Sequence, residues 1–325
     1  MADETGDMWV STLGTGITRF TGKELVAYST EEGIYNRGHG SLLQDSKGNY
    51  WIATKKGIAR FDGTRFIYFK TTPEILKGVY SLVEDSKGNI WMASSYYGLI
   101  KYDGNVFTLY SEENGLPHNS ILNIIKDKND NIWIGTRYGG VCKFDGSYFT
   151  TYKTEQGLSD NKILCLVEDK LGNIWAGTSG GGVNKINVNG FTEKIKMESF
   201  GKSRVRPILK DSTGDLWFGT EAAGLYRYNE TTMEKYFDQG LYNFHGFRSM
   251  FTTKKGNTWF GESDGYGFYK YSNNQFQHYR VPQERSSGLS VLEDRNGVFW
   301  FGTSSEGFGS FDGNELVYTN EKEGL

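Results

Sequence analysis

Cysteine is scarce in this 325-residue chain, where Cys142 and Cys165 are the only two and both fall in predicted strands. We therefore expect buried thiols rather than a disulfide framework. No apolar run reaches ten residues, which excludes a membrane span within the chain. The formal net charge of -3 argues against a nucleic-acid partner.

Motifs for common active sites are also lacking. The sequence contains no phosphate-binding loop, no Gly-x-Ser-x-Gly elbow and no His-Glu-x-x-His pair. Its four histidines fall in different segments of the chain, so we predict no shared metal site. The sequence therefore predicts no cofactor, no metal and no catalytic residue.

Tryptophan, in contrast, recurs at a nearly constant spacing. Its eight copies lie 40 to 42 residues apart, at Trp9, Trp51, Trp91, Trp133, Trp175, Trp217, Trp259 and Trp300. A repeat of this length with a tryptophan in one strand is typical of radial β-architectures. Because every unit carries the ring at the same place, we expect it to pack between units rather than bind sugars.

Each unit contains four short strands, as residues 121–127, 132–136, 141–145 and 149–152 illustrate. The first two are apolar runs, and the last two alternate. The first hairpin carries an Asp-x-x-Gly turn, as at Asp85 and Gly88, and the second an Asp-Gly pair, as at Asp145 and Gly146. The fold class is thus all-β, a β-propeller of four-stranded antiparallel blades.

Both ends of the sequence fall within a repeat. Residues 1–9 align with residues 83–91, at the end of a first strand, whereas residues 323–325 align with residues 114–116, which precede one. We favour eight blades and keep seven blades plus a partial unit as the alternative. The period crosses the whole chain, so we treat residues 1–325 as one domain, a segment of a longer protein or a trimmed one.

Candidate site residues are those where one repeat differs from the others. At one position of the first strand the series reads Gly40, Tyr80, Leu122, Leu164, Arg206, Arg248 and Leu289. Three residues after the tryptophan, the repeats carry Thr or Ser except for Glu262. Nearby loops expected on the same face contribute further polar residues: Arg204, Glu221, Tyr242, His245, Asp264 and Tyr266.

These residues predict a polar ligand at the channel mouth. Guanidinium groups match carboxylates, and aromatic rings stack on sugars. Other repeats add residues to the same face, among them Arg137, Tyr138 and His118. The alternative is a local ion pair between Arg248 and Glu262 without a ligand.

The repeat resembles the two-component regulator propeller family. The resemblance rests on residues 114–122 (NGLPHNSIL), 130–136 (DNIWIGT), 139–141 (GGV) and 143–146 (KFDG), and it recurs along the chain. Such propellers are commonly extracytoplasmic oligosaccharide sensors of hybrid two-component systems. The resemblance therefore implies a non-catalytic sensor with a small-molecule or oligosaccharide ligand, a periplasmic or extracellular location, and further domains in a parent sensor kinase.

Two alternatives remain open. Residues 257–262 (NTWFGE) with His245 resemble a segment of the propeller lyases of the streptogramin lyase group. A lyase would act on a polysaccharide or cyclic ester, with His245, Tyr242 or Tyr266 moving protons and Arg248 or a metal stabilising an anion. The third hypothesis is a protein-interaction scaffold.

Overall fold

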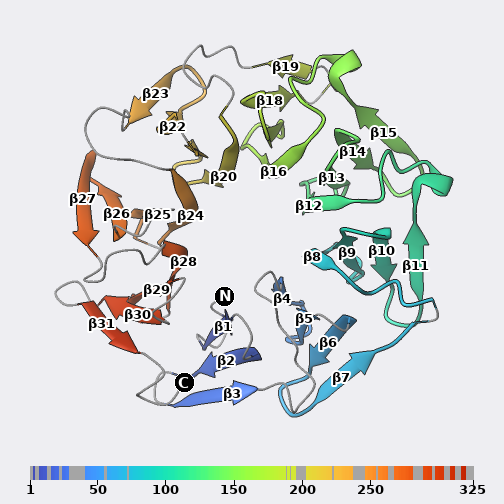
Figure 1. Ribbon diagram of the computed structural model, residues 1–325, viewed down its shortest axis with the longest axis horizontal. Coiled ribbons are helices and arrows are strands. Elements are labelled where there is room, and N and C mark those ends of the chain that lie inside the picture. The colour runs from blue at the N-terminus through green and yellow to red at the C-terminus, as the bar shows by residue number, and fades with distance from the viewer. Residues whose placement is uncertain are drawn as a thin grey trace.

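The computed structural model describes residues 3, 7–12, 16–21, 24–28, 41–54, 57–71, 73–187, 189–190, 192–194, 203–221, 223–236, 246–253, 255–262, 267–280, 288–294, 297–303, 308–311 and 316–319. Within these residues, short antiparallel sheets stand side by side in a ring (Figure 1). Seven of these sheets have four strands, and β1, β2 and β3 form a three-stranded one. This architecture confirms the predicted all-β propeller fold of four-stranded antiparallel blades.

The strands nearest the ring centre are β4 (Leu42–Gln44), β8 (Val79–Glu84), β12 (Ile121–Lys126), β16 (Ile163–Glu168), β20 (Val205–Lys210), β24 (Phe247–Thr252) and β28 (Gly288–Glu293). The tryptophan strands follow: β1 (Met8–Thr12), β5 (Tyr50–Thr54), β9 (Ile90–Ser94), β13 (Ile132–Thr136), β17 (Ile174–Thr178), β21 (Leu216–Thr220), β25 (Thr258–Glu262) and β29 (Phe299–Thr303). Each pairs with the strand before it, except β1, whose described partner is β2.

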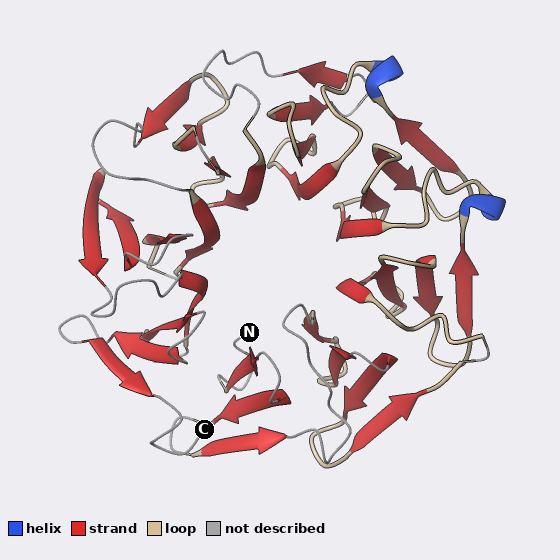
Figure 2. Cartoon of the chain, in the orientation of Figure 1, coloured by secondary structure: helices blue, strands red, loops and turns tan. Residues whose placement is uncertain are grey.

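The next strands outward are β2 (Gly16–Phe20), β6 (Gly57–Phe61), β10 (Gly98–Tyr102), β14 (Val141–Phe144), β18 (Val183–Ile186), β22 (Leu225–Tyr228), β26 (Gly267–Ser272) and β30 (Phe308–Phe311). The rim strands are β3 (Leu25–Tyr28), β7 (Phe66–Phe69), β11 (Phe107–Tyr110), β15 (Phe149–Tyr152), β19 (Thr192–Lys194), β23 (Met233–Tyr236), β27 (Gln275–Arg280) and β31 (Leu316–Thr319). Two short 3-10 helices, η1 (Glu112–Asn114) and η2 (Thr154–Gln156), follow β11 and β15 (Figure 2). Among the described residues, no helix is long and apolar enough to cross a bilayer.

The core consists of apolar layers between neighbouring sheets. Trp133, for example, packs with Ile174 and Ile186 of the next sheet, and Trp217 packs with Phe260 and Tyr271. The tryptophans from Trp9 to Trp259 are at most 6% exposed. Burial of such rings supplies the main stabilising contribution, which confirms the prediction that the tryptophans pack between units.

The turn aspartates do more than close their hairpins. Asp127 accepts a hydrogen bond from the Trp133 indole at 2.8 Å, and it also binds the Asn131 side chain and the turn backbone. Asp3, Asp45, Asp85, Asp169, Asp211 and Asp294 accept the same indole bond in their own sheets. One carboxylate therefore fixes both the turn and the buried ring.

The segments that enter the first strands are anchored by a glycine and a leucine. Gly115 ends η1 with a φ of 96°, a conformation that favours glycine, and Leu116 is then 2% exposed. Gly157 and Leu158 repeat this arrangement after η2. The leucine of this repeated Gly-Leu pair therefore belongs to the core.

Candidate functional site

The position at which the sequence places two arginines is a β-bulge. Ile121 pairs with Thr136 and Asn123 with Gly135, so Leu122 is an extra residue in β12. The same register shift leaves Tyr80, Leu164, Arg248 and Leu289 unpaired, and in β20 it spans residues 206 and 207. Because bulges redirect side chains, this position is suited to vary without disturbing the sheet.

Arg206 is exposed at its bulge, on a strand beside the ring centre. In the sheet before it, Leu164 is only 8% exposed at the equivalent place. The neighbouring β24 lies next to β20 and carries Arg248, whose side chain is outside the described part of the structure. The structure therefore brings the backbones of both arginine positions together and exposes the Arg206 side chain.

Arg204 lies at the same end of this sheet. Its Nη1 is 3.5 Å from Glu221 Oε2, both side chains are half exposed, and the backbones of the two residues are also hydrogen bonded. An exposed pair of this kind is weak and can exchange partners with a ligand.

Arg137 and Tyr138 follow β13 at the same end of their own sheet, two sheets away from Arg206. Arg137 Nε donates to Ser120 Oγ at 3.2 Å. The Tyr138 ring is 63% exposed and meets the His118 ring edge-on, with 5.2 Å between their centroids. They form a separate polar and aromatic surface.

Glu262 occupies a buried position. In other sheets this position carries a hydroxyl that closes a hairpin: Thr136 Oγ1 donates to Gly140 O at 2.8 Å and accepts from Gly139 N. Glu262 is 6% exposed, and its Oε2 lies 3.7 Å from His278 Nε2, too far for a hydrogen bond. Neither atom has a hydrogen-bond partner among the described residues. His278 lies on the rim strand β27.

Tyr242, His245 and Tyr266 lie outside the described residues, as does Asp264. Their roles, and those of Arg206, Arg248, Glu262, Arg204, Arg137 and Tyr138 in binding, stay predictions. Among the residues that are described, no three His, Cys, Asp or Glu side chains cluster as metal ligands.

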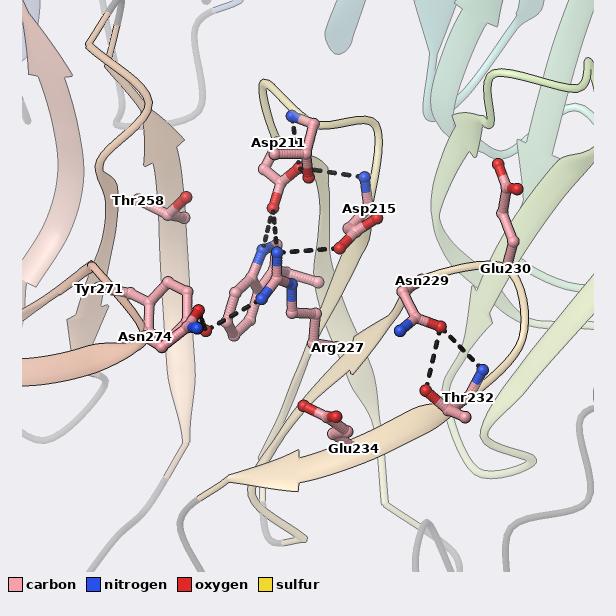
Figure 3. Close-up of polar contacts among 12 residues, drawn as sticks. Asp211, Asp215, Arg227, Asn229, Glu230, Thr232, Glu234, Thr258, Tyr271 and Asn274 are labelled. Carbon is pink, nitrogen blue, oxygen red and sulfur yellow. Dashed lines mark hydrogen bonds and ion pairs between the residues drawn. The ribbon is translucent and has the colours of Figure 1, made fainter.

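The sequence reasoning missed a cavity at the other end of the β20–β23 sheet. It has a volume of about 320 Å³ and is lined by Arg227, Asn229, Glu234, Tyr236, Tyr271 and Asn274. Figure 3 shows Arg227 between the β26–β27 hairpin on one side and Asp211 and Asp215 on the other. The sequence signal for it is weak: Glu230 replaces the glycine of equivalent outer turns, but Arg227 stands where Arg19 and Arg60 stand in other sheets.

Arg227 is held from both sides. Its Nη1 donates to the Tyr271 hydroxyl at 2.9 Å, and its Nη2 lies 2.9 Å from Asp215 Oδ2 and 3.7 Å from Asp211 Oδ2. Burial opposes the charge, but Tyr271, Asp215 and Asp211 outweigh it and raise the pKa of Arg227. The guanidinium is therefore permanently charged and compensated within the protein.

A family model described as two component regulator propeller matches residues 75–96, 115–138 and 157–180. These three segments match the repeat of this family. The matches cover the Trp91, Trp133 and Trp175 hairpins, each with its inner strand and the turn aspartate. Comparison with curated proteins gave no match in sequence.

The propeller is similar to several solved structures. One is the extracellular domain of a B. thetaiotaomicron protein described as a hybrid two-component system, with 19% identity and a TM-score of 0.59. The alignment covers 98% of this chain and 51% of that one, so the propeller spans about half the length of this relative.

Two further solved structures with a similar fold are described with other functions. Virginiamycin B lyase from Staphylococcus aureus aligns over 87% of this chain and 97% of its own, with 17% identity and a TM-score of 0.63. PorZ, a surface component of the type-IX secretion system of Porphyromonas gingivalis, aligns over 98% of this chain and 52% of its own, with 12% identity and a TM-score of 0.57. At these identities the similarity concerns the fold alone.

Proposed function

We propose that this chain is a non-catalytic ligand-binding sensor propeller that recognises an oligosaccharide or an acidic sugar beside the ring centre. The observation that carries the proposal is Arg206, an exposed cation on a bulge where other sheets place Leu122 or Leu164. A charged side chain there contributes nothing to the core, whereas it can bind a carboxylate.

The binding surface that we propose extends over the β20–β23 and β24–β27 sheets. Arg204 and Arg206 flank Val205, the first residue of β20. Val205 is fully buried, so it holds the start of this strand against the core. Arg248 occupies the equivalent bulge of the adjacent strand. From the sequence pattern we place Tyr242, His245 and Tyr266 at this surface, and we assign Arg137 and Tyr138 to a second, separate part of the binding face.

We further propose that the ring has eight blades within a single domain, residues 1–325. The supporting contact joins the first and last sheets: the rings of Phe20 in β2 and Trp300 in β29 have centroids 4.8 Å apart. Trp259 and Phe311 make the corresponding contact between the two preceding sheets, at 5.8 Å. The junction of the first and last sheets thus has the same kind of aromatic contact as a junction within the ring, which supports closure of the ring without a further blade.

By the repeat family and the extracellular domain to which the fold is similar, we propose a periplasmic or extracellular location within a two-component signalling protein. The further domains of the parent sensor kinase would transmit the binding event. This assignment is testable by expressing the full-length gene product and following kinase activity with ligand.

Thermal unfolding against a panel of neutral and uronic-acid oligosaccharides tests the binding proposal. A ligand at a hundredfold its dissociation constant stabilises the native state by roughly 2.7 kcal/mol. We expect an upward shift with the uronic-acid class. Failure of every sugar to shift the transition of the folded protein would favour the protein-interaction scaffold instead.

A lyase is the second candidate, favoured by Glu262 and His278, whose Oε2 and Nε2 atoms lie 3.7 Å apart and have no hydrogen-bond partner among the described residues. Glu262 is almost completely buried, which restricts its access to a substrate. Product analysis of each stabilising sugar, with His278→Ala as the comparison, separates the two functions: a sensor releases the sugar unchanged.

A further inference from the structure

The cavity beside Arg227 is formed by departures from the repeat. Asp215 stands where Asn49, Asn89, Asn131, Asn173 and Asn257 stand in other sheets, and the first sheet alone has an equivalent aspartate, Asp7, which pairs with Arg19. Glu230 has a positive φ of 77° at the place where equivalent turns have a glycine with positive φ, namely Gly63, Gly104 and Gly146. Its Oε1 forms an ion pair with Lys170 Nζ at 2.7 Å. Asn273 and Asn274 form a tight turn with φ of 51° and 60°.

The cavity is separate from the surface around Arg206. Lys210, Leu216, Tyr228 and Met233 are paired in succession and define one end of the β20–β23 sheet. The outer turn with Asn229 leaves from this end, whereas Arg204 and Glu221 lie at the opposite end. Ligands of the two places would therefore approach opposite faces of the ring.

The charges of the cavity favour a cation. Arg227 is the one guanidinium in the lining, and Asp211, Asp215 and Glu234 are three carboxylates on or beside it. Asp211 and Asp215 already compensate Arg227, and among the described residues no cation is paired with the exposed Glu234 of the lining. An anion would meet net repulsion here.

The remaining groups favour hydroxyls. Tyr236 donates to Glu234 Oε2 at 2.6 Å, and Tyr271 donates to Asn274 Oδ1 at 3.0 Å. Asn229 Oδ1 accepts bonds from Thr231 and Thr232. Both carboxamide oxygens are thus engaged within the protein, which leaves the two amino groups available as donors to a ligand.

We propose that this cavity binds a small hydroxylated amine, of the size of one amino sugar, with its ammonium group at Glu234 and its hydroxyls at Asn229, Asn274 and Tyr271. The volume of about 320 Å³ fits a single ring. The second oxygen of Glu234 accepts the ammonium proton. The Tyr236 ring, which is only partly buried, lines the cavity beside these groups.

Calorimetric titration of the 325-residue chain with D-glucosamine, D-glucose and D-glucuronate tests the proposal, because the three probes share a ring and differ in charge. We expect glucosamine to bind, glucose to bind about tenfold more weakly, as the loss of a charged hydrogen bond implies, and glucuronate to show no binding in Arg206→Leu, the variant that disables the surface proposed above for acidic sugars. Absence of glucosamine binding, or equal binding of the three, overturns the proposal.

Variants locate the site. Glu234→Gln should weaken glucosamine binding about tenfold, whereas Glu113→Gln, the same change at an exposed residue of η1, should not. Asp215→Asn introduces the asparagine of other sheets and should also weaken glucosamine binding while the protein stays folded. Arg206→Leu should leave glucosamine binding unchanged. Loss of glucosamine binding in Arg206→Leu, or full binding in Glu234→Gln, would place the amine elsewhere and refute the assignment.

Discussion

The Trp133 indole donates a hydrogen bond to Asp127 at 2.8 Å, across a hairpin turn that the same carboxylate closes. Asp127 is 6% exposed and Trp133 is also 6% exposed, so this bond lies inside the apolar layer between two sheets. Removing the carboxylate leaves a buried indole N–H and a buried Asn131 amide without their acceptor.

Asp127→Ala should therefore lower the free energy of unfolding by about 2–4 kcal/mol. Asp145→Ala is the matched control, because Asp145 closes an exposed turn without a tryptophan. We expect a loss of about 1 kcal/mol there. Urea unfolding followed by tryptophan fluorescence measures both; equal losses would mean that the indole bond contributes nothing.

The turn carboxylates also predict acid sensitivity. Burial opposes ionisation of Asp85, but hydrogen bonds from Asn89, Trp91 and the backbone lower its pKa overall. A carboxyl whose pKa is lower in the folded state stabilises the fold above its unfolded pKa of about 3.9 and loses that contribution as the pH falls further. Stability should be flat from neutral pH to about pH 5 and fall below it.

Asp85→Asn should lower the free energy of unfolding at neutral pH. It should also reduce the additional destabilisation between pH 7 and pH 3, which urea midpoints at the two pH values would measure. An unchanged difference between the two pH values would assign the acid sensitivity to other carboxyls.

The two cysteines should be unreactive in the folded protein. Both are free, Cys142 is buried and Cys165 is partly buried, and desolvation raises the pKa of each thiol to about 12. Since the thiolate is the reactive form, a thiol reagent at pH 8 should label neither at an appreciable rate until urea is added. Rapid labelling of Cys142 in native protein would contradict its place in the core.

Ring closure gives another prediction. Phe20→Ala removes the ring that contacts Trp300 and should cost about 1–3 kcal/mol. Hydrogen exchange should then increase in β29 as well as in β2, because the two sheets share this contact. Faster exchange confined to β1, β2 and β3 would indicate that the first and last sheets do not support one another.

The sequence predicted the parts of the fold that depend on local pattern. The tryptophan period and the turn residues were sufficient for strands, hairpins and packing between blades. The indole bond to Asp127 went unpredicted, although a constant spacing of six residues was visible, because an aspartate in a turn already has a local explanation.

The candidate site was harder to predict because it depends on where side chains point. The sequence singled out Arg206 and Glu262 equally, yet the bulge exposes the first and the strand end buries the second against His278. The Arg227 cavity needed two sheets to meet, through Tyr271 and Asn274, and no pattern within one repeat shows that contact.

The most direct test of the proposed sensor function is calorimetric titration of the chain and of Arg206→Leu with oligogalacturonate, with a neutral oligosaccharide of equal length alongside. Arg65→Leu, a change of an exposed arginine in an outer turn, is the control. We expect saturable binding of the uronic-acid oligosaccharide that Arg206→Leu weakens about tenfold and Arg65→Leu leaves intact. Equal binding by the chain and Arg206→Leu would contradict it.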